Sequence, residues 1–185
     1  MEDKKIENVN FIQNPLVDVE YEYCTFLNCD CSNADLSGMV FMECEFDECN
    51  LSMAKLVKTT LRDIRFKNCK MLGMHFENCN EFGLAVSFDN CNLSDSSFYK
   101  TVIKKTNFRN SKLYEVDFSL CDLTGSVFDN CDFEKAIFAD TILEKADFST
   151  SFNYSIDPEL NRIKKARFSL VGIEGLLDKY DIIIK

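Results

Sequence analysis

The chain has 185 residues, of which 46% are hydrophobic and 28% are charged, and its formal net charge is −10. This length fits one domain with a small appendage, and the negative charge argues against direct nucleic-acid binding, which needs clustered Lys and Arg. No apolar run reaches the roughly 20 residues of a membrane-spanning helix. The charged N-terminus lacks the apolar core of a signal peptide, so we expect a cytoplasmic protein.

The negative charge is concentrated near the N-terminus. Residues 6–54 contain ten acidic side chains and no Lys or Arg, whereas residues 55–185 contain 19 side chains of each sign. A folded chain that keeps these segments in order is electrically polar from end to end. We predict that eight of the acids form an outward-facing acidic face: Glu20, Glu22, Asp30, Asp35, Glu43, Glu45, Asp47 and Glu48.

Large apolar residues recur every five positions, first from Ile6 to Phe76 and again from Phe88 to Phe148. A small or moderately apolar residue, often Cys, stands two places before most of these centres, and the other three places of each unit are mainly polar. A period of five fits neither the 3.6-residue period of a helix nor the two-residue period of a strand. Two places in five are therefore predicted to point inward and three outward.

The units Ala34-Asp-Leu-Ser-Gly38, Cys121-Asp-Leu-Thr-Gly125 and Ala146-Asp-Phe-Ser-Thr150 resemble the consensus of the pentapeptide-repeat family, and the resemblance covers roughly residues 6–150. It implies an all-β solenoid, a right-handed quadrilateral β-helix in which four units make one square coil and residues 20 apart stack. About seven coils, spaced ~4.8 Å apart, would form a rod on the order of 35 Å long. The expected core ladders are Phe26, Phe46 and Phe66 in one, and Phe88, Phe108, Phe128 and Phe148 in another.

The repeat is interrupted once. Phe76 and Phe88 are twelve residues apart instead of ten, and we expect a bulge or short excursion at 77–87 in which Gly83 supplies backbone freedom. The chain is accordingly divided into a β-helix over residues 1–150 and a C-terminal part over residues 151–185.

The C-terminal part is predicted to form a last partial coil and a cap, because the end of a solenoid exposes apolar side chains and strand edges. Residues 172–185 are interpreted as a short helix followed by a strand over Tyr180–Ile184. Similarity to the quinolone-resistance pentapeptide proteins implies a two-fold homodimer through this strand, and the alternative is a monomer with the isoleucines folded back on the last coil. The residues assigned to the cap or dimer are Leu176, Leu177, Tyr180, Ile182 and Ile184.

Nothing in the sequence points to catalysis, a cofactor or a metal. Nine of the ten cysteines occupy the small inward place, their spacings differ from those of paired zinc ligands, and His75 is the only histidine. The paired acids lie at outward places of a convex rod, outside the buried or pocketed setting that acid–base catalysis by a carboxyl group requires. We therefore predict buried structural cysteines, with no catalytic residue, no metal and no cofactor.

Two protein-binding functions remain. The quinolone-resistance members bind DNA gyrase and topoisomerase IV as DNA mimics and limit drug poisoning, so the resemblance implies that the acidic face could bind a type II topoisomerase. The long projecting loops of many such members are absent from this sequence. The alternative is a structural or adaptor module that presents a flat β-face to another protein partner through outward apolar residues such as Leu27, Val40, Met42, Val57 and Leu72. Neither function involves direct contact with nucleic acid or a membrane.

Overall fold

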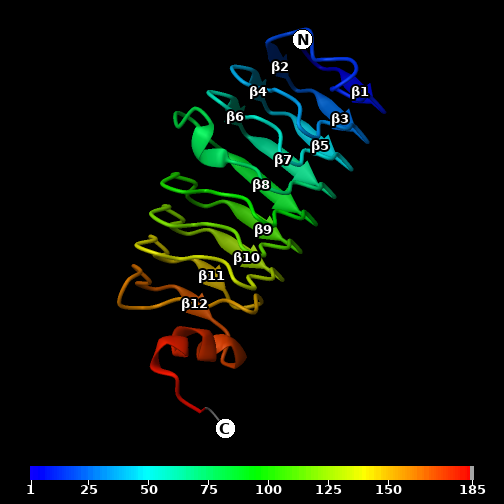
Figure 1. Ribbon diagram of the computed structural model, residues 1–185. Helices are drawn as coiled ribbons and strands as arrows, with labels where there is room; N and C mark the ends of the chain where they lie inside the picture. Colours follow the sequence, from blue (N-terminus) through cyan, green and yellow to red (C-terminus); the bar gives the residue numbers. More distant parts are fainter. Residues whose placement is uncertain (184–185) are drawn as a thin grey trace.

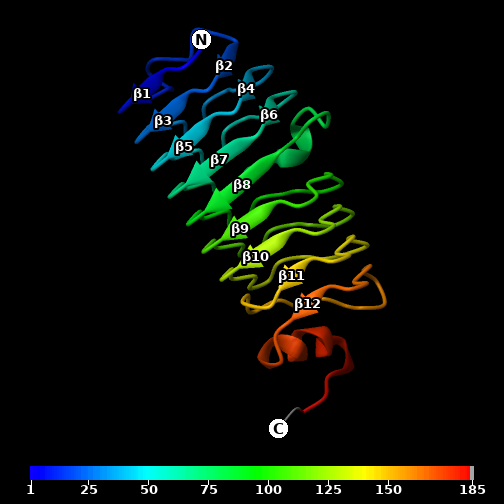
Figure 2. The ribbon, with the colours of Figure 1, turned by 180° about the vertical axis from the view of Figure 1, so that it is seen from behind.

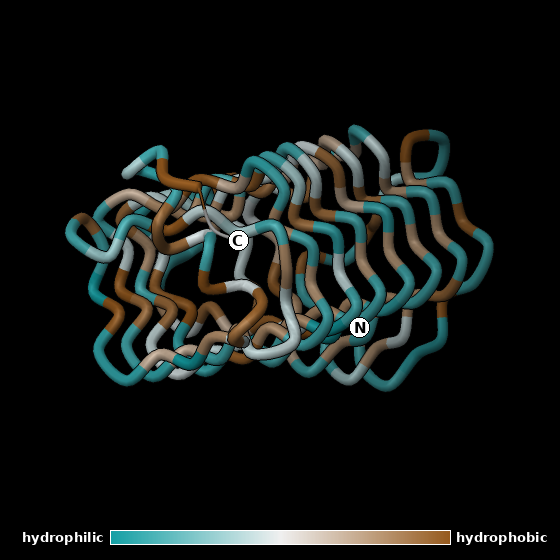
Figure 3. Tube along the Cα trace, turned by 90° about the horizontal axis from the view of Figure 1, so that it is seen from below, coloured by the Kyte–Doolittle hydropathy of each residue, from teal (hydrophilic) through white to brown (hydrophobic). Residues whose placement is uncertain are grey.

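The computed structural model describes residues 1–183 and is an all-β parallel solenoid of about 8 turns. The coils follow one another along the rod from the N-terminus to the C-terminus (Figure 1), and the view from behind shows the same continuous stack (Figure 2). Seen from below, successive coils repeat the same path and alternate between hydrophilic and hydrophobic residues (Figure 3). The predicted quadrilateral β-helix is confirmed.

Two parallel sheets form two of the four sides. The β1 side has the strand order β1-β3-β5-β7-β8-β9-β10-β11-β12, and the β2 side begins with β2-β4-β6. On the β1 side the strands are β1 (Lys5–Glu7), β3 (Thr25–Leu27), β5 (Glu45–Asp47), β7 (Ile64–Lys67), β8 (Val86–Asp89), β9 (Asn107–Arg109), β10 (Val127–Asp129), β11 (Asp147–Phe148) and β12 (Arg167–Phe168). On the β2 side they are β2 (Glu20–Glu22), β4 (Val40–Met42) and β6 (Thr60–Arg62), continued by bridges from Val102 through Asp122 and Ile142 to Arg162.

Ladders of single bridges form the other two sides. One, the Asn10 side, runs from Asn10 through Asp30 and Asn50 to Phe152, and the other, the Asp35 side, includes Asp35, Lys55 and the ladder from His75 to Ile137. Within each ladder the partners are 20 residues apart, except across the excursion, where they are 22 apart. Each unit of five residues therefore turns the chain from one side to the next.

The core is built on stacked phenylalanines. Phe66 and Phe88 stack at 5.4 Å between ring centroids, so the two predicted ladders are in fact one continuous ladder from Phe26 to Phe168. They are joined because the two extra residues lie on the β2 side and leave the β1 side in register. A second ladder includes Phe98 and packs edge-to-face against the first, the geometry that aromatic quadrupoles favour.

The small inward place carries a repeated hydrogen bond. The thiol of Cys49 donates to the carbonyl of Phe26 at 3.4 Å, and the hydroxyl of Ser151 donates to the carbonyl of Phe128 at 2.8 Å. Both bonds join residues 23 apart and satisfy a carbonyl inside the rod. This shared role explains why Cys, Ser and Thr alternate at this place, and all ten cysteines are buried and free of disulfides.

The excursion at 77–87 overlaps the short helix η1 (Phe76–Asn78), which begins one residue before it. In both Figures 1 and 2 it projects from the flank that carries β2, β4 and β6. Gly83 has a φ of +78°, and a Cβ there would lie 3.0 Å from Nε of Arg62, so both its backbone angle and its close packing favour glycine. Phe82 is 77% exposed, and the Arg62 guanidinium lies 5.7 Å from the centre of its ring.

The C-terminal cap differs from the prediction. The helical part is confirmed as two 3₁₀ helices, η2 (Val171–Leu176) and η3 (Asp178–Tyr180), but the predicted strand is wrong as far as Ile183. Tyr180 ends η3, Asp181 adopts a left-handed conformation that turns the chain, and residues 182–183 have no regular structure. Ile183 is 85% exposed, so the alternative of folding back on the last coil is also wrong, and Ile184 lies outside the described residues.

The part of the chain that the structure describes has no helix that is both long and apolar enough to cross a bilayer.

Candidate functional site

The eight predicted acids lie on all four sides of the rod. Glu45, Asp47 and Glu48 lie in or directly after β5 on the β1 side. Glu20 and Glu22 lie in β2 and Glu43 follows β4 on the β2 side, whereas Asp30 and Asp35 lie on the Asn10 and Asp35 sides. The prediction of a single acidic face is therefore wrong, because each step of five residues moves the chain round one corner. These residues instead form an acidic collar, the name used below for the eight carboxylates of residues 20–48.

Two members of the acidic collar also stabilise the fold. The Asp30 carboxylate accepts hydrogen bonds from the Ser32 backbone at 3.0 Å and the Ser32 hydroxyl at 2.6 Å. Asp35 accepts a bond from the Ser37 backbone at 3.0 Å. Hydrogen bonds from these serines lower the pKa of both carboxyls, so both remain charged well below neutral pH. The pattern Asx-x-Ser/Thr is the sequence signal for this turn, which recurs at Asp122 and Thr124.

The acidic collar has little internal neutralisation. Within residues 1–183, Glu45 is its only member that forms an ion pair, with Lys67 at 3.0 Å. Asp47 accepts a hydrogen bond from the Asn68 amide at 2.8 Å, which leaves its charge intact. The collar therefore presents mostly uncompensated carboxylates around the N-terminal coils.

Three of the buried cysteines lack the features of a reactive site. Burial raises the pKa of the Cys79, Cys121 and Cys131 thiols to about 12, so they are protonated at neutral pH and are poor nucleophiles. Among the described residues, no three His, Cys, Asp or Glu side chains are grouped so that they could hold a metal ion. The arrangement of these thiols is that of core packing.

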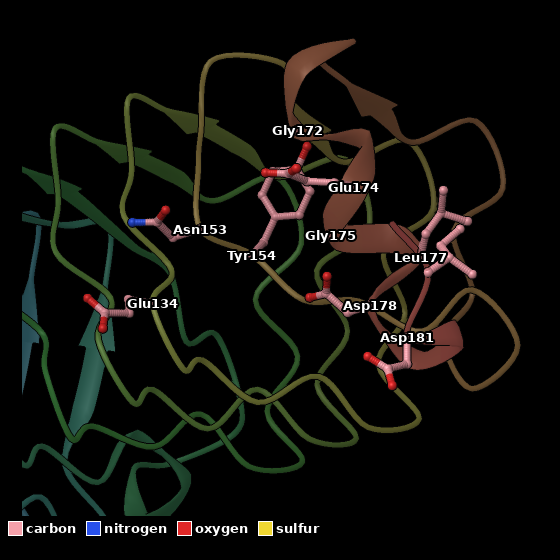
Figure 4. A pocket seen from close by; sticks show the side chains of 10 residues that line it. Glu134, Asn153, Tyr154, Gly172, Glu174, Gly175, Leu177, Asp178 and Asp181 are labelled. Atoms are coloured by element: carbon pink, nitrogen blue, oxygen red, sulfur yellow. The ribbon is translucent and has the colours of Figure 1, made fainter. Parts of the chain in front are cut away.

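A cleft of about 740 Å³ lies between the last coil and the cap, lined by Tyr154, Leu177 and four carboxylates (Figure 4). Two glycines bring the cap onto Tyr154. A Cβ on Gly172 would lie 2.2 Å from the Tyr154 hydroxyl, and a Cβ on Gly175 would lie 1.9 Å from the Tyr154 carbonyl oxygen. The carbonyl of Gly175 accepts a bond from the Ile156 backbone at 2.8 Å, so the backbones of cap and coil are directly joined. In the sequence, the only signal for this close packing is a pair of glycines three residues apart in a predicted helix.

The residues assigned to the cap lie at its surface or on its inner edge. Leu176 and Leu177 are half-buried, whereas Tyr180 and Ile182 are exposed. Lys179 fastens η3 to the last coil through ion pairs of 2.7 Å with both Asp157 and Glu159.

We expect Gly175→Ala to loosen the cap. The added methyl meets a backbone oxygen that has no freedom to move aside, and overpacking of this kind costs about 1–3 kcal/mol. Thermal unfolding and hydrogen exchange of residues 171–180 measure the effect. Glu174→Ala, an exposed neighbour in the same helix, is the control and should leave both unchanged; equal behaviour of the two variants would contradict the packing argument.

Two family models match the chain, pentapeptide repeats in eight copies over residues 24–63 and a pentapeptide repeat region over residues 84–152, which together cover more than half of it. The chain belongs to the pentapeptide-repeat family. It is similar to the quinolone resistance pentapeptide repeat protein QnrB96 of Scandinavium goeteborgense, with 32% identity over 75 residues. That match covers 40% of this chain and 35% of the relative, so it spans about a third of the relative's length.

Solved structures of relatives share the whole architecture of this pentapeptide-repeat protein. Full-length QnrB1, described as a plasmid-mediated fluoroquinolone resistance protein, superposes with a TM-score of 0.65 at 19% identity and covers 98% of this chain and 99% of its own. A trypsin-treated variant of QnrB1 gives a TM-score of 0.59 at 20% identity, covering 100% and 98%. At these identities the likeness establishes the fold.

Proposed function

We propose that this protein is a non-catalytic, cytoplasmic binding protein that mimics DNA, occupies the DNA-binding groove of a type II topoisomerase (DNA gyrase or topoisomerase IV) and protects that enzyme from quinolones. The acidic collar is the observation that carries the proposal. The similarity to proteins described by their quinolone resistance supports it.

The charge density of the N-terminal coils resembles that of a duplex. Residues 6–54 carry ten acidic side chains and no basic ones, and at 20 residues per coil they occupy about 12 Å of the rod. This is one charge per about 1.2 Å, against one per about 1.7 Å along B-DNA. Because the carboxylates lie on all four sides, as phosphates surround a duplex axis, a groove lined with Lys and Arg would meet negative charge in any orientation.

The acidic segment is short, and the remainder of the rod is close to neutral. We therefore propose that the N-terminal coils enter the enzyme's groove while the C-terminal coils stay outside it. The outward apolar residues considered for an adaptor, Leu27, Val40, Met42, Val57 and Leu72, are distributed over all four sides and do not form one patch.

A matched pair of double variants tests this function. Glu43 and Glu48 share a place in the repeat with Asp95 and Asp140, all with positive φ, and Lys58 occupies the same place, so the fold accepts lysine there. We expect the wild type to inhibit gyrase supercoiling and to reduce fluoroquinolone-stimulated DNA cleavage.

The variant E43K/E48K should lose this activity by about tenfold or more, because like charges then face the basic groove, while D95K/D140K should retain it. Equal activity of the two double variants, or no effect of the wild type on gyrase and topoisomerase IV, would overturn the proposal.

A further inference from the structure

The charges of the β2 side are separated along the rod. Its N-terminal half, from β2 to the excursion, carries five carboxylates, Glu20, Glu22, Glu43, Asp63 and Glu81, against the single base Arg62. Its C-terminal half carries two carboxylates against six bases: Lys104, Lys105, Lys145, Arg162, Lys164 and Lys165. One surface therefore has a net charge of −4 in one half and +4 in the other.

The β1 side is organised differently. There, charges of opposite sign lie on adjacent coils and pair within the chain: Lys67 with Glu45, Arg109 with Asp89, and Arg167 with Asp147. On the β2 side, Lys105, Lys145, Lys164 and Lys165 form no ion pair with any side chain of residues 1–183. These bases are available to carboxylates outside the chain.

We propose that the β2 side is a self-complementary surface on which a second copy of this chain binds in antiparallel orientation. In such a two-fold arrangement, a residue near one end of the side faces a residue near the other end of the partner, and the reverse pair forms at the same time. Each negative half then faces a positive half. A parallel arrangement would place like charges opposite each other.

The order of the coils matches from β2 to the coil of Arg162. With the two-fold axis between the excursion and the coil of Val102, Glu20 and Glu22 face Lys164 and Lys165, because the coils of these two pairs lie at equal distances from the axis. The next coils inward place Glu43 opposite Lys145. Since coils are evenly spaced in a parallel stack, both pairs form in a single register.

The residues at the centre of the β2 side also fit this register. Arg62 faces Asp122 one coil further in, and the excursion faces the coil of Val102. Phe82 and Val102 are both exposed apolar residues and lie close to the axis, where a second copy would cover them. Charged ends around an apolar centre are the usual anatomy of a specific interface.

The area of the β2 side sets the expected affinity of the dimer. Eight coils span about 38 Å and three outward residues per coil span about 10 Å, so the contact covers about 380 Å² on each copy, or roughly 800 Å² in all. This is the size of a weak, transient interface. We expect a salt-sensitive dimer with a Kd in the micromolar range, which has to dissociate before the acidic collar can enter a basic groove. Its two-fold axis differs from that of the C-terminal association implied by the resemblance, which would use the cap.

Sedimentation equilibrium of charge-reversed variants tests the arrangement. At about 0.1 M salt the wild type should approach twice its 21.3 kDa, and at about 1 M salt, where the screening length falls to roughly 3 Å, it should be monomeric. K164E/K165E and E20K/E22K should each be monomeric alone. Mixed in equal amounts they should form a heterodimer, since the reversed ends match again at both sites.

The mixture separates this inference from misfolding, because two misfolded chains would not restore each other. K70E/K112E, a double reversal on the Asn10 side, is the control and should dimerise like the wild type. The proposal would be overturned by a monomeric wild type or by a mixture that stays monomeric. It would also be overturned by a dimer that persists in each reversed variant alone and is held by the cap.

Discussion

Phe108→Ala should lower the free energy of unfolding by about 3–5 kcal/mol, the cost of removing a fully buried aromatic ring. The Phe108 ring has 0% exposure and lies between Phe88 and Phe128, each 4.9 Å away between centroids. It also meets Phe98 edge-to-face at 6.0 Å. Because domains of this size are stable by only about 5–15 kcal/mol, the variant should lose a large part of its stability.

Urea unfolding followed by circular dichroism measures this loss. Phe152→Ala is the control, since Phe152 is 44% exposed and lies outside the ladder, and it should cost less than about 1 kcal/mol. A loss for Phe108→Ala as small as that of the control would mean that the ladder is not the main support of the rod.

Stability should also fall steeply as the pH rises from about 9 toward 12. Burial raises the pKa of Cys79, Cys121 and Cys131 to about 12 from the ordinary value of 9.0. Above pH 9 the unfolded chain therefore releases protons that the folded chain retains, so unfolding becomes easier. Each thiol contributes about 1.4 kcal/mol per pH unit in this window, or roughly 4 kcal/mol per unit for the three.

Denaturant midpoints measured between pH 8 and 11 test this expectation. The triple variant C79S/C121S/C131S should show a shallower decline, and Ser already fills the same place in the repeat at Ser126 and Ser151. Parallel curves for the wild type and the triple variant would contradict the role of the buried thiols.

The sequence predicts the architecture because each unit of the repeat performs the same task. The period of five, with Phe26, Phe46 and their successors at the centres, is enough to identify the residues of the core. The period of five does not specify how successive coils are placed relative to one another. The continuity of the ladder across Phe66 and Phe88 depends on which side takes the two extra residues, and local sequence does not determine that side.

The acidic site and the cap illustrate two further limits. The acids are close in sequence, but a chain that turns a corner every five residues separates neighbours such as Asp30 and Asp35 onto different sides. At the C-terminus, the β-branched isoleucines favour a strand, yet a strand needs a partner edge. The chain instead packs η2 and η3 on the last coil through Gly172 and Gly175, contacts that depend on distant Tyr154.

Displacement of DNA from a type II topoisomerase tests the proposed function most directly. A fluorescently labelled duplex bound to purified DNA gyrase is titrated with this protein, and release is followed by anisotropy at several salt concentrations. We predict that the wild type and D95K/D140K displace the duplex, that rising salt weakens displacement, and that E43K/E48K fails. A duplex that stays bound at every concentration of the wild type, or is released equally well by E43K/E48K, would contradict DNA mimicry by the acidic collar.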